Sequence, residues 1–178
     1  MTMTVDLRYP IGTFTPVAPA TAEVREAAIG DIAALPRKLR EAVAGLSDAQ
    51  LDTPYRPGGW TARQVVHHVA DSHMNGFIRL RLALTEDNPT IKPYDENAWS
   101  ALPDMRLPVD ISLALLDNLH TRWVALYRGM APGQFDRTFF HPEAKNTQSL
   151  DRHLQLYAWH SKHHVAHVAE LRKREGWA

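Results

Sequence analysis

Apolar residues recur at helical spacing in four long stretches, and these stretches predict four long helices. The first covers residues 21–45 and contains Pro36, so this helix is expected to be broken or kinked at the proline. The second begins at Thr61, which forms a capping-box pattern with Gln64, and runs to about Thr85.

The third and fourth stretches complete the helical pattern. The third has its apolar stripe between Leu113 and Tyr127 and ends before Pro132. The fourth begins at Ser149, a favoured N-cap residue, and ends at Gly176, a favoured C-cap residue. No strand pattern or internal repeat is visible. The sequence therefore predicts an all-α fold, a four-helix bundle with long irregular crossover loops.

The segments between these helices are rich in turn-forming residues. Residues 1–20 are rich in Thr and Pro and predict an extended N-terminal arm, while residues 47–50 form a capping box that opens a short turn. Residues 88–107 contain several prolines and predict a crossover loop, with at most a short turn at 95–102. The length of the chain predicts a single domain over residues 1–178.

Composition narrows the classes of partner. Lys and Arg total 20, as do Asp and Glu, so no net positive charge favours nucleic acid. No apolar run approaches the ~18 residues of a membrane span. The chain has no Cys, which excludes disulfides, thiolate metal ligands and a cysteine nucleophile. These features predict a cytoplasmic protein that binds neither nucleic acid nor membrane.

Histidine is the unusual component of the composition, with 10 residues. Three histidines fall together in the second predicted helix and five in the fourth. They are His67, His68 and His73 in the second helix, and His153, His160, His163, His164 and His167 in the fourth.

Spacing in the fourth helix predicts a metal-binding pair. Residues four apart lie on one face of a helix, so two imidazoles at this spacing can converge on one ion. His160 and His164 have this spacing, and so do His163 and His167. The first pair flanks the apolar stripe and is expected to face a neighbouring helix, whereas His163 is expected to point toward solvent. We therefore interpret His163 and His167 as surface residues, or at most as residues that contact the metal ligands.

A third ligand is expected from the second helix, where three histidines are available. The helical wheel places His73 near the middle of the apolar face and both His67 and His68 near its edges, so periodicity leaves the choice open. His73, His120 and His153 are interpreted as hydrogen-bonded core residues.

Two familiar kinds of metal site are excluded by inspection. Ser161 follows His160, so the zincin HExxH arrangement is absent. No Glu stands three residues before any His, which excludes the paired Glu-x-x-His motifs of di-iron bundles. A single mononuclear site remains.

Several segments together resemble a known family. The run LDTPYRPGGWT at 51–61, followed by RQVVHH at 63–68 and ADSHMN at 70–75, resembles the DinB superfamily, and within it the YfiT-type metal-dependent hydrolases. The resemblance covers nearly the whole chain. It continues in YPIG at 9–12, PYDE at 93–96 with Trp99, FHP at 140–142, and YAWH, HH and AH at 157–167.

This resemblance implies a DinB-type four-helix bundle, a homodimer, and one divalent metal ion per chain held by three histidines. The family's helix-two ligand lies eight residues after the tryptophan of the turn, which is His68 after Trp60. The other two ligands map onto His160 and His164. His153 departs from the family pattern and is treated as incidental.

Three imidazoles leave at least one open position, as catalytic zinc sites do. An open position can activate water for hydrolysis of a small-molecule substrate, or hold a small thiol as thiolate. Relatives in the superfamily are thiol-dependent S-transferases and isomerases that use bacillithiol, mycothiol or glutathione. Zinc is the expected metal, although imidazole sites also accept nickel, copper or iron.

Two alternatives to a metal-dependent enzyme belong to other functional classes. A non-catalytic metal-binding or stress-response protein would buffer more than one ion per chain, and a partner-binding module would use the histidines only structurally. For a catalytic site, Asp71, Tyr94, Asp95 and Arg56 are the candidates for a base or for substrate contacts.

Overall fold

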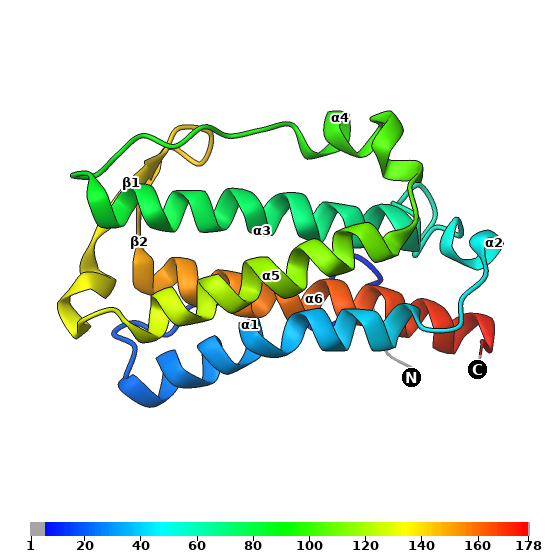
Figure 1. The fold of residues 1–178 in the computed structure, drawn as a ribbon, viewed down its shortest axis with the longest axis horizontal. Helices are drawn as coiled ribbons and strands as arrows, with labels where there is room; N and C mark the ends of the chain where they lie inside the picture. The colour runs from blue at the N-terminus through cyan, green and yellow to red at the C-terminus, as the bar shows by residue number, and fades with distance from the viewer. Residues whose placement is uncertain (1–5, 178) are drawn as a thin grey trace.

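The computed structural model describes residues 6–177, and four long helices dominate it (Figure 1). They are α1 (Ala22–Val43), α3 (Ala62–Thr85), α5 (Val109–Arg128) and α6 (Leu150–Glu175). The predicted four-helix bundle is confirmed. Within the described residues, no helix combines the length and apolar character needed to cross a bilayer.

The connecting segments contain short elements. They are α2 (Asp48–Leu51), α4 (Glu96–Ser100) and two 3-10 helices, η1 (Pro103–Arg106) and η2 (Pro132–Asp136). The first two match the turns expected at 47–50 and 95–102.

A small hairpin corrects the expectation that the chain has no strands. β1 (Thr138–His141) pairs antiparallel with β2 (Asn146–Ser149) just before α6. Each strand has only four residues, too few for an alternating pattern to stand out. An isolated two-stranded hairpin is marginal in water, and this one is held to the bundle by Phe139, which is 1% exposed.

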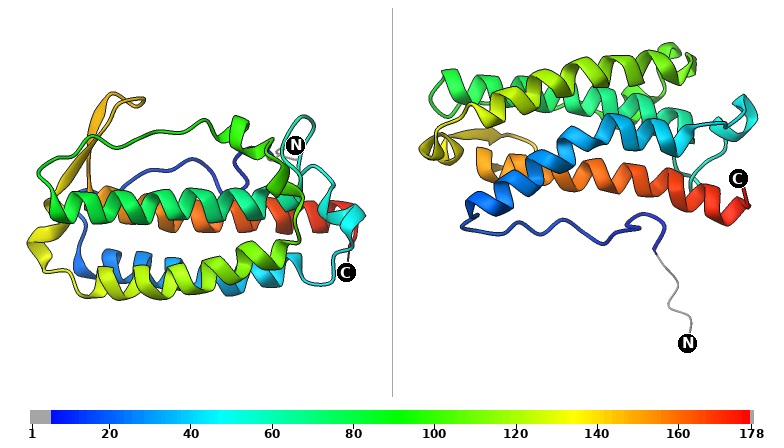
Figure 2. Two further views of the ribbon diagram at one scale, coloured as in Figure 1. Left: turned by 45° about the horizontal axis from the view of Figure 1, so that its top comes forward. Right: turned by 60° about the horizontal axis from the view of Figure 1, so that its bottom comes forward.

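The helix ends follow the capping signals of the sequence. The Thr61 side chain accepts a hydrogen bond from the Gln64 backbone N–H, and the Gln64 side chain accepts one from the Thr61 backbone N–H. Ser149 caps α6, which ends at Gly176 in the left-handed region with φ 69°. Of the two alternatives expected at Pro36, the break does not occur, because α1 is continuous through it. The axis of α1 bends (Figure 2, right), in agreement with the other alternative, a kink.

The helices form a ring in which chain order and spatial order differ. α1 packs against α5 and α6, and α3 packs against the same two helices. The order around the bundle is therefore α1, α5, α3, α6. The consecutive long helices α1 and α3 lie diagonally opposite each other, as do α5 and α6.

The core consists of two apolar clusters separated by a layer of imidazoles. One cluster contains Trp123 and Tyr157, and the other contains Leu116 and Val168. Along α3, α5 and α6, the histidines come between residues of the first cluster and residues of the second. They are His73, His120, His160 and His164. Polar groups thus occupy the middle of the bundle.

Residues 6–20 form an extended arm that runs along α6 in the opposite direction (Figure 2, right). The backbone N–H of Val17 donates to the Gln155 side chain (2.8 Å), which donates back to the Val17 carbonyl (3.0 Å). Farther along, Phe14 lies against Trp159 with ring centroids 6.0 Å apart. The arm therefore covers the face of α6 that points away from the bundle.

Candidate metal centre

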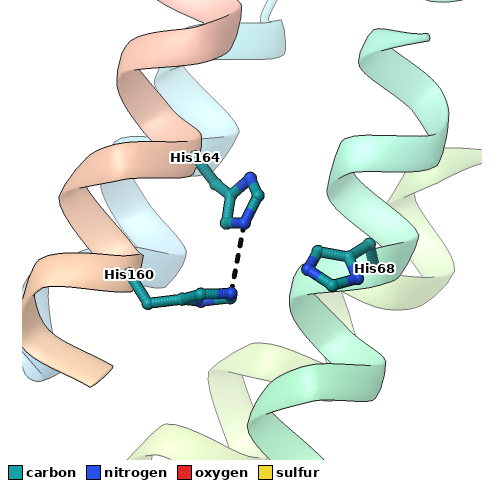
Figure 3. A group of neighbouring side chains, drawn as sticks. All are labelled: His68, His160 and His164. Atoms are coloured by element: carbon teal, nitrogen blue, oxygen red, sulfur yellow. Dashed lines mark hydrogen bonds between the residues drawn. The ribbon is translucent and has the colours of Figure 1, made fainter. Parts of the chain in front are cut away.

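Three imidazoles converge between α3 and α6 (Figure 3). His68 projects from α3, and His160 and His164 project from α6. Each ring offers one nitrogen, and these nitrogens all lie within 4.8 Å of one another. The Nε2 atoms of His160 and His164 are 3.1 Å apart, the contact dashed in Figure 3.

The donor set and spacing fit a divalent ion of the zinc type. Imidazole nitrogens lie about 2.0–2.1 Å from zinc, so two of them at a tetrahedral angle are about 3.3 Å apart. The observed 3.1 Å is close to that separation. The group offers three ligand atoms, whereas zinc takes four. A ligand from outside the group can therefore take the remaining position.

Geometry distinguishes His68 from its neighbour His67, which the helical wheel did not. The His67 ring turns away from α6, with Nδ1 2.7 Å from the Ser112 hydroxyl and Nε2 3.0 Å from the Leu107 carbonyl. His68 instead lies against the Trp60 indole, with ring centroids 4.4 Å apart. The turn before α3 thus positions the ring that joins the cluster.

Burial keeps the three rings in the form that binds metal. Burial, followed by the nearby His167 and His163, lowers the pKa of His68 to about 4. Burial also lowers the pKa of His160 and of His164 well below its ordinary range. All three imidazoles are neutral near pH 7, and neutral imidazole is the ligating species.

The histidines expected in the core are buried and hydrogen-bonded, as predicted. His73 Nδ1 lies 2.9 Å from His120 Nε2, and His120 Nδ1 lies 2.7 Å from a backbone carbonyl. His153 Nδ1 lies 2.7 Å from the Tyr127 hydroxyl. His73 also lies 3.0 Å from His160, so it contacts the candidate centre directly.

The expectation that His163 and His167 are surface residues is wrong, since they are 7% and 3% exposed. His163 stacks on Trp159 at 4.3 Å and lies 6.0 Å from Tyr9 in the arm. His167 stacks on Tyr55 at 4.0 Å. Segments distant in sequence cover this face of α6, and a helical wheel cannot include them.

Asp71 lies in α3 and Tyr94 in the crossover loop that follows it, and both have a shifted pKa. Asp71 is partly buried one helical turn after His68, and burial raises the pKa of its carboxyl to about 6. Burial first, then the charge of Glu96, raises the pKa of Tyr94, and Asp71 contributes in the same direction.

The other two candidates, Asp95 and Arg56, take part in local structure. The Asp95 carboxylate caps α4 by accepting a hydrogen bond from the Ala98 backbone N–H at 2.9 Å. Arg56 donates to the Pro57 carbonyl at 3.1 Å and to the Tyr55 hydroxyl at 3.3 Å.

Two aromatic neighbours of the centre were missed by sequence reasoning. Trp60 packs on His68, and Tyr157 lies 5.8 Å from His160 with its hydroxyl donating to the Ser72 carbonyl. Tyr157 belongs to the apolar stripe of α6, and the sequence carries no signal that separates it from ordinary core residues.

Comparison with known proteins agrees with this geometry. Residues 31–168 match the DinB superfamily. The chain belongs to this family. Two DinB relatives, from Bacillus mycoides (strain KBAB4) and Bacillus cereus (strain B4264), are 55% and 56% identical over 172 residues. Each alignment covers 97% of this chain and 99% of the relative, and both proteins are named "Putative metal-dependent hydrolase".

A solved DinB-type structure resembles the whole fold. YfiT from Bacillus subtilis superposes with a TM-score of 0.95 at 51% identity, covering 97% of this chain and 99% of that one. It is described as "a probable metal-dependent hydrolase with an unusual four-helix bundle topology".

Proposed function

We propose that this protein is a metal-dependent hydrolase that uses one divalent ion, zinc first, held by His68, His160 and His164. The observation that carries the proposal is the convergence of three neutral imidazoles, two of them buried and that of His160 half-buried, whose ligand nitrogens lie within 4.8 Å of one another. The names of the relatives from Bacillus support the same activity.

The donor set favours a catalytic over a purely structural site. Structural zinc sites are closed by four protein ligands, and catalytic ones have three and leave a position for water or substrate. An ion bound here supplies Lewis acidity, which makes a coordinated water or thiol easier to deprotonate. His160 is half-buried, whereas His68 and His164 are buried.

Asp71 is the residue best suited to accept a proton in this reaction. Asp71 follows His68 by about one turn of α3, and its pKa of about 6 is near the working pH, where proton transfer is most efficient. The Tyr94 hydroxyl stays protonated at neutral pH, so it can donate a hydrogen bond to substrate.

Metal content tests the proposal. Protein purified without a His tag is expected to contain one ion per chain by elemental analysis. The double variant His68→Ala, His160→Ala is expected to lose that ion, and the matched control His67→Ala to retain it, because His67 bonds to Ser112 and Leu107 instead. Full metal content in the double variant would overturn the proposal.

Activity measurements separate hydrolysis from the alternatives. A panel of esters, amides and other electrophiles is assayed with and without low-molecular-weight thiols. Turnover without thiol supports hydrolysis. Turnover only with thiol would indicate S-transfer, for which the chain has no cysteine of its own to offer. More than one ion per chain without turnover would indicate a metal-buffering protein.

A further inference from the structure

A line of hydrogen-bonded imidazoles leads from His160 through the bundle. His160 Nδ1 lies 3.0 Å from His73 Nε2, and His73 Nδ1 lies 2.9 Å from His120 Nε2. His120 Nδ1 lies 2.7 Å from the carbonyl oxygen of Ile32. The line takes one group from each of α6, α3, α5 and α1, so it connects all four long helices.

The Ile32 carbonyl can end this line because of the proline in α1. In a helix, the carbonyl of residue 32 would accept the backbone N–H of residue 36. Pro36 has no N–H, so that bond does not form. The Ile32 carbonyl instead accepts a hydrogen bond from His120. Pro36 therefore frees the acceptor at which the imidazole line ends.

Both inner rings of the line are neutral near pH 7. His73 is fully buried and His120 is 2% exposed. Burial lowers the pKa of His73 well below its ordinary range and that of His120 to about 4. A neutral imidazole has one nitrogen that donates and one that accepts.

A carbonyl oxygen only accepts, and this fixes the direction of every bond in the line. His120 must donate from Nδ1 to the Ile32 carbonyl, so its Nε2 accepts from His73 Nδ1. His73 Nε2 then accepts from His160 Nδ1. The remaining nitrogen of His160, Nε2, is left without a proton and with its lone pair toward His164.

A second line of hydrogen bonds determines which nitrogen of His164 carries the proton. His164 Nδ1 lies 3.3 Å from His167 Nδ1, and His167 Nε2 lies 3.2 Å from the carbonyl oxygen of Arg8 in the arm. His167 is 3% exposed, and burial lowers its pKa to about 4. It donates from Nε2 to the carbonyl and accepts from His164 Nδ1. The lone pair of His164 Nε2 therefore faces His160.

We propose that these two lines, each ending at a backbone carbonyl, set the tautomers of His160 and His164 so that both Nε2 lone pairs are presented to the metal. His73, His120 and His167 are positioning residues in this arrangement. The inference rests on the metal centre proposed above. It also accounts for the 3.1 Å contact between the two Nε2 atoms. Neither atom carries a proton, so their two lone pairs face each other and a cation can bind both.

His68 provides an internal comparison. None of the hydrogen bonds described between residues 6 and 177 involves its ring, which packs on Trp60 instead. Its tautomer is set by the metal, whereas those of the two α6 ligands are set in advance by the protein.

Nitrogen NMR of the histidine rings tests the inference directly. Long-range ¹H–¹⁵N correlation of ¹⁵N-labelled protein at neutral pH, before and after one equivalent of Zn²⁺, reports which ring nitrogen carries the proton. Before Zn²⁺ is added, four rings are expected to be protonated on Nδ1 and His167 on Nε2. The four rings are His73, His120, His160 and His164. A wild-type protein with His73 or His120 protonated on Nε2, or exchanging between tautomers, would overturn the inference.

Zn²⁺ affinity, measured by competition with a chelating dye, tests the role of the line. His120→Leu removes the acceptor for His73 Nδ1, and affinity is expected to fall about 10- to 100-fold, as for other residues that orient metal ligands. His120→Gln can accept and donate at the same two places and is expected to restore most of the affinity. His153→Leu removes a buried histidine outside both lines, so its affinity should match the wild type.

The outcomes distinguish this inference from the proposed function. If the wild-type protein binds no Zn²⁺, the metal centre fails and the inference fails with it. If the wild type binds Zn²⁺ and His120→Leu binds it equally tightly, only the inference fails. If His120→Leu does not fold, the tautomers of the wild-type protein still decide the matter.

Discussion

Gly76 in α3 faces the ring of Tyr157 in α6 at a distance that leaves no room for a side chain. A Cβ added at residue 76 would overlap three atoms of this ring. The Tyr157 ring is fixed in turn, since its hydroxyl donates to the Ser72 carbonyl at 3.1 Å and its ring centroid lies 5.1 Å from that of His73, with the two rings nearly perpendicular. Glycine at this position thus lets α3 and α6 approach beside the metal centre.

We expect Gly76→Ala to destabilise the protein. Overpacking a core costs about 1–3 kcal/mol, which exceeds the ~1 kcal/mol that alanine gains over glycine within a helix. Urea unfolding measures the difference. A variant as stable as the wild type would show that Tyr157 can move aside.

Gly30→Ala is the control for Gly76→Ala, because it makes the same substitution within a helix where there is space for a side chain. Gly30 is exposed within α1, and a Cβ there meets no atom within 4 Å. Alanine is expected to stabilise the protein by about 0.5–1 kcal/mol, because glycine loses more backbone freedom on folding. The same urea experiment should show opposite signs for the two variants.

Among single residues, the sequence predicted much of the centre. Helical spacing offered two pairs, His160 with His164 and His163 with His167, and the apolar stripe favoured the first pair. The structure brings His160 and His164 together with His68. Helical spacing left His67 and His68 undecided, because both lie at an edge of the apolar stripe and only the partners Ser112 and Leu107 separate them.

At the scale of elements, the first turn of α3 contributes both to the stability of the helix and to the position of His68. The reciprocal bonds between Thr61 and Gln64 close this turn, next to Trp60, which packs on His68. We expect Thr61→Ala to lower the free energy of unfolding by about 0.5–2 kcal/mol and to weaken Zn²⁺ binding.

Two variants serve as controls for this prediction. Thr61→Ser retains the capping hydroxyl and should behave as the wild type. Thr21→Ala removes the N-cap of α1, where the Thr21 side chain accepts from the Val24 backbone N–H, and should lower stability without affecting Zn²⁺. Equal Zn²⁺ affinity in both alanine variants would contradict a specific role for the Thr61 turn.

The long helices could be predicted from the sequence, but the short hairpin and the contacts between distant segments could not. Caps and apolar periodicity are local signals, so Thr61, Ser149 and Gly176 marked helix ends correctly. The hairpin at 138–149 is too short for a periodic signal, and its stability comes from packing on the bundle. The burial of α6 beneath the arm, residues 6–20, arises from contacts between distant segments, which no local pattern encodes.

At the scale of the whole molecule, the ion is expected to act as a clamp between α3 and α6. A ligand that binds only the folded state at 100 times its dissociation constant adds about 2.7 kcal/mol, or roughly 5–11 °C in Tm for a chain of this size. Calorimetry with and without Zn²⁺ measures the shift. The His68→Ala variant, which lacks the ligand from α3, should show a much smaller one.

The buried histidines make the metal-free protein sensitive to acid. Burial lowers the pKa of His120 to about 4 and that of His153 to about 3, from 6.5 in the unfolded chain. The unfolded state therefore binds more protons between these values, and stability present above pH 6.5 is lost as the pH falls through 4. Asp71 has the opposite effect, because its pKa is raised to about 6 in the folded protein. The folded state takes up one proton there at a higher pH than the unfolded state does, which offsets part of the loss of stability.

We expect the Tm of the metal-free protein to fall steadily as the pH is lowered from neutral. Each proton taken up on unfolding contributes about 1.4 kcal/mol per pH unit. His153→Leu removes one of the responsible groups, so its Tm should depend less on pH. A Tm that stays constant from neutral pH to pH 5 would contradict this account.

Two of the three proposed ligands, His160 and His164, lie one turn apart on a single helix. A nascent turn of α6 can therefore capture an ion before any other helix docks, whereas His68 joins only when the bundle closes. Zn²⁺ present during refolding would then act early, by favouring the nucleation of α6, and a cation held by the denatured chain would offset part of the stabilisation at equilibrium.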